Sequence, residues 1–112
     1  MDTTIEHDGA LTIVIIPSEH LDASNAKKFQ RDMVPIFQKD AKVIFDVSQV
    51  RFVDSSGLGA LLSCLRQLHA VGGDLKLHGL AKPVRALFEL VRMHRIFDIY
   101  NTREEAVQAF QS

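Results

Sequence analysis

The chain has 112 residues, a formal net charge of −1 and a pI near 6.5. This length fits one domain, residues 1–112, that buries roughly two-thirds of its unfolded surface. The charge balance gives no basic field for nucleic acid or for an anionic membrane. A single cysteine, Cys64, excludes an internal disulfide and a cysteine-rich metal site and is expected to be a buried or half-buried helix thiol. No signal pattern begins the chain and no apolar run approaches the ~20 residues of a membrane span, so we expect a cytoplasmic protein without membrane insertion.

The first third of the chain predicts a hairpin followed by a helix. Residues 3–7 form a candidate edge strand, and Asp8-Gly9 is a hairpin turn signal before a strand at residues 11–16, which Pro17 ends. Asp22 is a candidate N-cap for the following helix. The apolar stripe of that helix is Ala26, Phe29, Met33 and Phe37. Pro35 removes an amide inside the pattern, so the helix is expected to kink or end near Val34.

A buried strand at residues 42–47 leads to the stretch Val50-Arg51-Phe52-Val53-Asp54-Ser55-Ser56-Gly57-Leu58-Gly59. Leucines at helical spacing follow it, with Ser55 or Ser56 as candidate N-cap. Each glycine inside a helix costs roughly 1 kcal/mol relative to alanine. Gly57 and Gly59 therefore serve either tight packing of the turn or close approach of another molecule to a serine hydroxyl. On the second reading, Gly57→Val impairs partner binding and leaves the domain folded.

The last third predicts two more helices and two strands. Gly72-Gly73 is a helix stop signal, and Leu75 and Leu77 alternate with Lys76 and His78 in a strand with one wetter face. Pro83 suits the first turn of a third helix with an apolar face of Val84, Leu87, Phe88 and Val91. Residues 96–100 predict a final short strand. Thr102 and Glu105 have the spacing of a capping box before a last helix, with Val107 and Phe110 on its apolar side.

The predicted fold class is α/β: a small, mixed, mostly parallel sheet of about five strands with about four helices. Consecutive strand-helix-strand units favour parallel pairing with right-handed crossovers. Loops that follow parallel strands gather at the carboxyl ends of those strands. Asp22, residues 54–56 and the turn at residues 80–83 are therefore expected to share one surface.

Catalysis by this surface is not expected. A serine hydrolase needs a base and an orienting group, and only His20 and His78 flank the candidate loops. The local sequence lacks the Gly-x-Ser-x-Gly nucleophile elbow. The histidines lack paired metal-ligand spacing, and Gly57-Leu58-Gly59 is too short for a nucleotide-binding loop. We expect a substrate and binding partner that is not an enzyme and needs no cofactor or metal.

Residues 53–59, Val-Asp-Ser-Ser-Gly-Leu-Gly, resemble the signature of STAS-domain anti-sigma factor antagonists. Leu21-Asp22 followed by Ala26, then Gly72-Gly73, and then Pro-Val-Arg-Ala-Leu-Phe at residues 83–88 also stand in the order of that family. The resemblance covers nearly the whole chain and implies a STAS-like fold. Residues 17–20, Pro-Ser-Glu-His, depart from the Gly-Glu pair of many members.

The resemblance implies a phosphorylation-controlled partner switch. Ser56 stands at the phosphoacceptor position, while Ser55 is expected to point back towards the sheet. The unphosphorylated form would bind a serine-kinase anti-sigma factor or a related switch kinase, phosphorylation would release it, and a PP2C-type serine phosphatase would reset it. The expected partner-binding residues are Asp22, Asp54, Ser55, Gly57, Leu58 and Gly59.

Three readings stay open at this point. Asp22 and Asp54 also suit purely structural roles, as helix cap and turn residue. The switch could control an output other than a sigma factor. The domain could instead be a non-enzymatic ligand-binding or structural STAS module.

Overall fold

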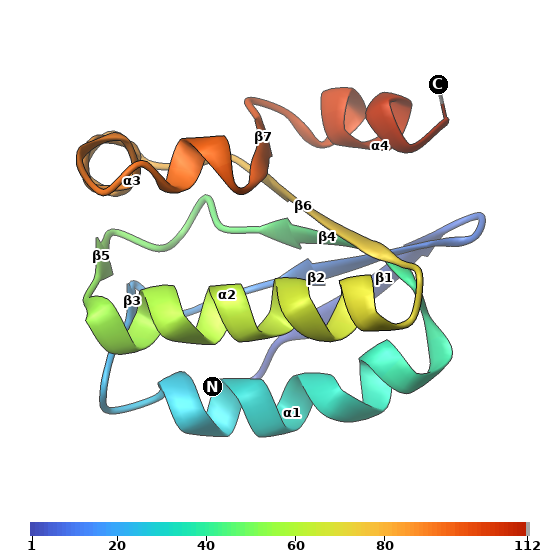
Figure 1. The fold of residues 1–112 in the computed structure, drawn as a ribbon, viewed down its shortest axis with the longest axis horizontal. Helices are drawn as coiled ribbons and strands as arrows, with labels where there is room; N and C mark the ends of the chain where they lie inside the picture. Colours follow the sequence, from blue (N-terminus) through green and yellow to red (C-terminus); the bar gives the residue numbers. More distant parts are fainter. Residues whose placement is uncertain (112) are drawn as a thin grey trace.

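A five-stranded mixed sheet forms the centre of the computed structural model, which describes residues 1–111 (Figure 1). Its strand order is β1-β2-β4-β6-β7. The strands are β1 (Thr4–Asp8), β2 (Leu11–Ile15), β4 (Lys42–Asp46), β6 (Asp74–His78) and β7 (Asp98–Tyr100). Strand β1 pairs antiparallel with β2, and every other neighbouring pair is parallel. The predicted mixed, mostly parallel sheet is therefore confirmed.

Helices cover both faces of this sheet (Figure 1). They are α1 (Ala26–Lys39), α2 (Ser55–Ala70), α3 (Lys82–Leu90) and α4 (Arg103–Gln111), with the 3-10 helix η1 (Met93–Arg95) after α3. Helices α1 and α2 lie against one face and α4 lies against the other. Helix α1 does not end near Val34: it contains Pro35 and continues to Lys39, because the apolar stripe holds it on the sheet up to Phe37.

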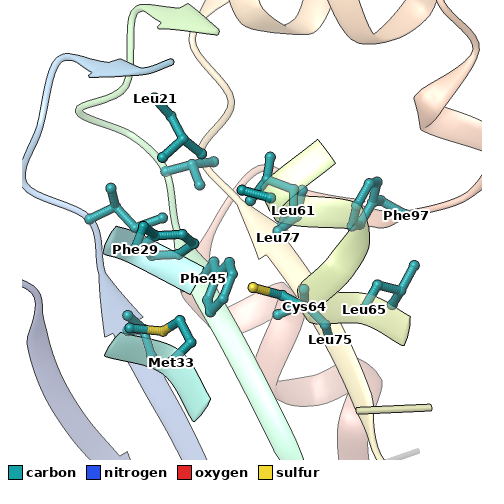
Figure 2. Close-up of a cluster of buried hydrophobic side chains, with 14 of the residues drawn as sticks. Leu21, Phe29, Met33, Phe45, Leu61, Cys64, Leu65, Leu75, Leu77 and Phe97 are labelled. Atoms are coloured by element: carbon teal, nitrogen blue, oxygen red, sulfur yellow. The ribbon is translucent and has the colours of Figure 1, made fainter. Parts of the chain in front are cut away.

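The main core lies between the sheet and helices α1, α2 and α3 (Figure 2). Phe29 of α1 meets Phe45 of β4 edge to face with ring centroids 5.5 Å apart, and Phe37 stacks on the same ring. Cys64 is fully buried on α2, as the sequence predicts, and burial raises the pKa of its thiol to about 12. This thiol stays protonated near neutral pH and is part of the packing.

The second face of the sheet is dry, which the alternation in β6 did not predict. Lys76 and His78 are each only 7% exposed because α4 covers them. The Lys76 amine lies 3.2 Å from Asp74 and 3.0 Å from Asp98, with the Phe110 ring centroid at 4.6 Å. The expected wetter face is therefore wrong, since a nine-residue helix closes over it.

Helix α4 begins at the predicted pair Thr102 and Glu105, with Thr102 as the N-cap and, within residues 1–111, without the second capping-box bond from the Thr102 amide. The hydroxyl of Thr102 accepts a hydrogen bond from the amide of Glu105 at 3.1 Å and donates one to the Glu105 carboxylate at 3.2 Å. This cap fixes the start of the helix that covers Lys76 and His78.

A second, two-stranded sheet positions the loops of interest. Strands β3 (His20–Leu21) and β5 (Phe52–Val53) pair in parallel at the end of the molecule where α2 begins (Figure 1). Each strand has only two residues, which is too short for a periodic pattern in the sequence. No helix within residues 1–111 is long and apolar enough to cross a membrane.

Candidate functional site

Asp54 is the N-cap of α2. Its Oδ1 accepts a hydrogen bond from the amide of Gly57 at 2.9 Å, and its backbone is extended while Ser55 is already helical. The expectation that Ser55 or Ser56 caps this helix is wrong, because the helix begins one residue earlier. Both serines therefore lie in the first turn of α2, with their hydroxyls free of the capping role.

The same carboxylate joins two loops. Asp54 Oδ2 accepts a hydrogen bond from the amide of Ala23 at 3.1 Å, and the Asp54 amide donates to the carbonyl of Leu21 at 3.4 Å. The turn before α1 is thereby fastened beside the start of α2. This contact brings Asp22 and the serines to one surface, as the parallel topology predicts.

Asp22 stabilises a turn and does not cap a helix. Its Oδ1 accepts hydrogen bonds from the amide of Ser24 at 3.0 Å and from the Ser24 hydroxyl at 2.5 Å. These bonds lower the pKa of the Asp22 carboxyl, with His20 Nδ1 3.2 Å away as a smaller contribution. The predicted cap is wrong because a turn over residues 22–25 intervenes: α1 begins at Ala26, with Asn25 at the N-cap position.

Gly57 and Gly59 have different surroundings. A Cβ built on Gly57 lies 2.0 Å from the carbonyl oxygen of Leu21, so only glycine allows α2 to pack this closely on β3. A Cβ on Gly59 meets nothing within 4 Å. Gly57 is buried and has the packing role, so we expect Gly57→Val to disrupt the domain and not, as the second reading predicts, to leave it folded. Gly59 is exposed and leaves the surface beside Ser56 open.

Ser55 and Ser56 are both exposed, which corrects the expectation that Ser55 points back towards the sheet. Within residues 1–111, neither hydroxyl takes part in a hydrogen bond. The two serines differ in their neighbours, because Ser56 lines a groove of about 570 Å³ between α1 and α2 and Ser55 does not. The other residues of this groove are Ala23, Ala26, Lys27, Gln30 and Gly59.

The α1 side of this groove was not predicted from the sequence. Ala23, Lys27 and Gln30 precede Ser56 by about thirty positions, and their spacing carries no sign of a shared site. Lys27 places an exposed cation on the wall that faces the start of α2. Leu58, by contrast, is half-buried and packs against the main core.

The third predicted loop follows β6. Gly79 has a φ of +82° and leads the chain into α3, which contacts β5 and so lies next to the strand before Asp54. Pro83 occupies the first turn of α3, as predicted. The loops after β3, β5 and β6 therefore gather at one end of the molecule.

The two candidate histidines lie apart from the serines in the hydrogen-bond network. His20 pairs with Asp22, whereas His78 is buried with its Nε2 3.9 Å from Asp46 and without a hydrogen-bond partner among residues 1–111. Burial lowers the pKa of His78. In the described part of the chain no three metal-ligating side chains form a group. Within residues 1–111, neither histidine is hydrogen-bonded to Ser55 or Ser56.

Comparison with known proteins defines the family. Residues 3–106 match the model of the STAS domain, and the chain belongs to this family. BtrV of Bordetella bronchiseptica is 30% identical over 93 residues, which are 82% of this chain and 80% of BtrV. The anti-sigma-B factor antagonist of Bacillus subtilis is 28% identical over 88 residues, 79% of this chain and 81% of that protein. The resemblance to anti-sigma factor antagonists is thereby confirmed.

Solved structures share the fold. TM1081 of Thermotoga maritima has a TM-score of 0.91 at 23% identity, covering 98% of this chain and 95% of its own. The anti-sigma factor antagonist SpoIIAA in its unphosphorylated form has a TM-score of 0.73 at 20% identity, covering 99% of both chains. These likenesses confirm the predicted STAS-like fold.

Proposed function

We propose that this protein is a phosphorylation-controlled partner switch with Ser56 as its phosphoacceptor. The unphosphorylated form binds a serine-kinase anti-sigma factor or a related switch kinase and releases the target that this kinase held. Phosphorylation of Ser56 ends the interaction, and a PP2C-type phosphatase restores it. In this proposal residues 1–112 are one cytoplasmic STAS domain that is bound and modified but does not itself catalyse a reaction.

The exposed hydroxyl of Ser56 beside the groove between α1 and α2 is the observation that carries the proposal. A kinase must place its nucleotide phosphate in line with the acceptor oxygen and supplies the metal and the base itself. Ser56 meets the requirement for access, because Gly59 leaves the adjacent surface open. The family relationship supports this role, since the Bacillus subtilis relative is named an anti-sigma-B factor antagonist.

The position of Ser56 also suits a reversible charge. A phosphate adds about −1.5 to −2 charges near neutral pH, and a helix N-terminus tolerates an anion well. The domain therefore stays folded when phosphorylated. The new charge joins Asp22 and Asp54 at the same surface, so its effect falls on the partner through repulsion and lost fit.

The test is phosphorylation by the cognate kinase with ATP, followed by mass spectrometry of the peptides. Wild type and Ser55→Ala should carry one phosphate on Ser56, and Ser56→Ala should carry none. The neighbouring serine is a matched control because both hydroxyls are exposed in the same helical turn. Phosphate confined to Ser55, or unchanged phosphorylation of Ser56→Ala, contradicts the assignment.

A further inference from the structure

A second exposed surface lies where α3 ends and η1 begins. It consists of Leu90, Val91, Arg92, Arg95 and Ile96, and we refer to it as the α3–η1 surface. Leu90 is 80% exposed, Ile96 52% and Val91 42%, and Leu90 is the most exposed large apolar side chain within residues 1–111. All five residues belong to the short segment 90–96, in which α3 ends and η1 follows.

The turn holds its apolar side chains outward. The amide of Val91 donates to the carbonyl of Leu87 at 3.0 Å, and the amide of Ile96 donates to that of Met93 at 3.0 Å. The interior below the turn is already filled by Phe88 and Phe97, whose ring centroids are 6.0 Å apart. The exposure of Leu90 and Ile96 is therefore a property of an ordered turn.

Positive charge accompanies this apolar surface. Residues 82–96 contain four lysines and arginines (Lys82, Arg85, Arg92, Arg95) and one acidic residue, Glu89, which gives a net charge of +3 in a chain whose total is −1. Within residues 1–111, neither Arg92 nor Arg95 forms an ion pair. The overall charge balance thus conceals a local basic region.

Arg92 is also in an unfavourable backbone conformation. Its φ of 62° and ψ of 26° are left-handed, and no other non-glycine residue in the described chain has a positive φ. Glycine adopts this conformation without the steric cost that a side chain adds. An exposed arginine at this position places a cation beside Leu90 at the expense of local stability.

We propose that the α3–η1 surface binds the surface of an anionic lipid bilayer, with Leu90 and Ile96 entering the headgroup region and the two arginines contacting lipid phosphates. Interfacial membrane binding combines burial of apolar side chains with attraction of lysine and arginine to anionic lipids, and it needs no complementary shape. A stable protein interface buries about 800 Å² per partner, more than the three exposed apolar side chains of this surface supply. The grooves lined by Phe37 and Val71, and by Ser56 and Gly59, lie elsewhere.

The α3–η1 surface shares no residue with the groove beside Ser56. Helix α1, which forms one wall of the groove beside Ser56, lies on the opposite side of the molecule from α3 in Figure 1. Because the whole chain carries a net charge of −1, the attraction is local and is screened by salt. The interaction should therefore be weak, reversible and strongest at low ionic strength.

Flotation of the purified protein with vesicles of phosphatidylglycerol and phosphatidylcholine tests the proposal. At low salt the wild type should float with these vesicles, and it should remain unbound with phosphatidylcholine alone or at high salt. Leu90→Ser, Arg95→Gln and Arg92→Gly should each weaken binding, by about fivefold for each lost arginine. Arg92→Gly has a second readout, because it relieves the left-handed strain and should unfold at an equal or higher temperature.

Arg31→Gln is the matched control, since Arg31 is an exposed arginine on α1. It should bind vesicles like the wild type. Failure of the wild type to float, unchanged binding by Leu90→Ser, or equal losses from Arg31→Gln and Arg95→Gln each overturns the proposal. Self-association of the wild type that Leu90→Ser abolishes overturns it in favour of a second copy of this chain as the occupant.

Discussion

The carboxylate of Asp54 accepts a hydrogen bond from the amide of Ala23, a residue 31 positions earlier, while it caps α2 through Gly57. One side chain thus sets the distance between the turn before α1 and the serines of α2. The groove beside Ser56 depends on this distance. Local capping and assembly of the candidate site thus depend on the two oxygens of one carboxylate.

Replacement of Asp54 should therefore lower stability as well as function. Asp54→Ala loses both contacts and should reduce the free energy of unfolding by about 1–3 kcal/mol. Asp54→Asn can still accept from Gly57 through its oxygen but turns an amide group towards the Ala23 donor. Its free energy of unfolding should therefore fall less than that of Asp54→Ala. Urea denaturation of both variants tests this order, with the exposed Asp2→Ala as control. Equal stabilities of wild type and Asp54→Ala would contradict the bridging role.

The two glycines of the motif offer a sharper contrast. Gly57→Ala places a methyl group on the Leu21 carbonyl and should cost about 3 kcal/mol or more, because backbone has to move. Gly59→Ala meets open space on the same helix and should raise stability by about 0.5–1 kcal/mol. Thermal unfolding of the pair measures this difference. Similar melting temperatures would show that α2 moves away from β3 without penalty.

The sequence predicted the elements that have a repeating pattern. The hairpin, the parallel strands and the cap formed by Thr102 and Glu105 follow from alternation, helical spacing and turn chemistry. The close approach of Gly57 to Leu21 did not, because it depends on the pairing of two strands of two residues each. Burial of Lys76 and His78 was missed for a similar reason, since a distant helix covers them.

The sequence predicted which residues gather at the candidate site better than it predicted the structural role of each one. Parallel topology brings Asp22 and Asp54 to the same end of the sheet, and the structure agrees. Which carboxylate caps a helix depends on where the helix begins, and a shift of one residue at α2 moved the cap from serine to Asp54. Lys27 lies on α1, and nothing in the sequence around Ser56 indicates that its cation lines the same groove.

A substitution at Asp22 can remove the negative charge of the carboxylate while keeping its hydrogen bonds in the turn. Asp22→Asn keeps an oxygen that accepts from Ser24, so the melting temperature should stay close to that of the wild type. If the carboxylate charge contributes to recognition, binding to the cognate kinase should weaken markedly while the melting temperature stays the same. Titration calorimetry with Asp2→Asn as the charge-matched control tests this. Equal binding by wild type and Asp22→Asn would confine Asp22 to the turn.

His78 should make stability depend on pH. Burial lowers its pKa below the ordinary value of 6.5, so the unfolded chain takes up a proton more readily than the folded one. Above pH 6.5 the imidazole is neutral in both states, and its protonation does not affect the free energy of unfolding. Below pH 6.5 the unfolded chain is protonated first, so the free energy of unfolding falls. His78→Gln should remove that part of the decline between neutral and mildly acidic pH in urea denaturation. An identical pH dependence of wild type and variant would show that other groups dominate.

Charge at Ser56 should interfere with the partner more than charge at Ser55. Ser56→Asp places a carboxylate in the groove that Lys27 and Gly59 line, where a kinase has to approach, whereas Ser55→Asp adds the same charge outside that groove. We expect Ser56→Asp to weaken kinase binding by about tenfold or more, or ~1.4 kcal/mol, and Ser55→Asp to weaken it less. Both variants should remain folded, because an anion in the first turn of a helix is stabilising by about 0.3–1 kcal/mol. Calorimetric titration of the two variants against the cognate kinase, with melting curves for each, makes the comparison. Equal loss from both positions would show that the surface responds to total charge, and it would remove the special role of Ser56 in the switch.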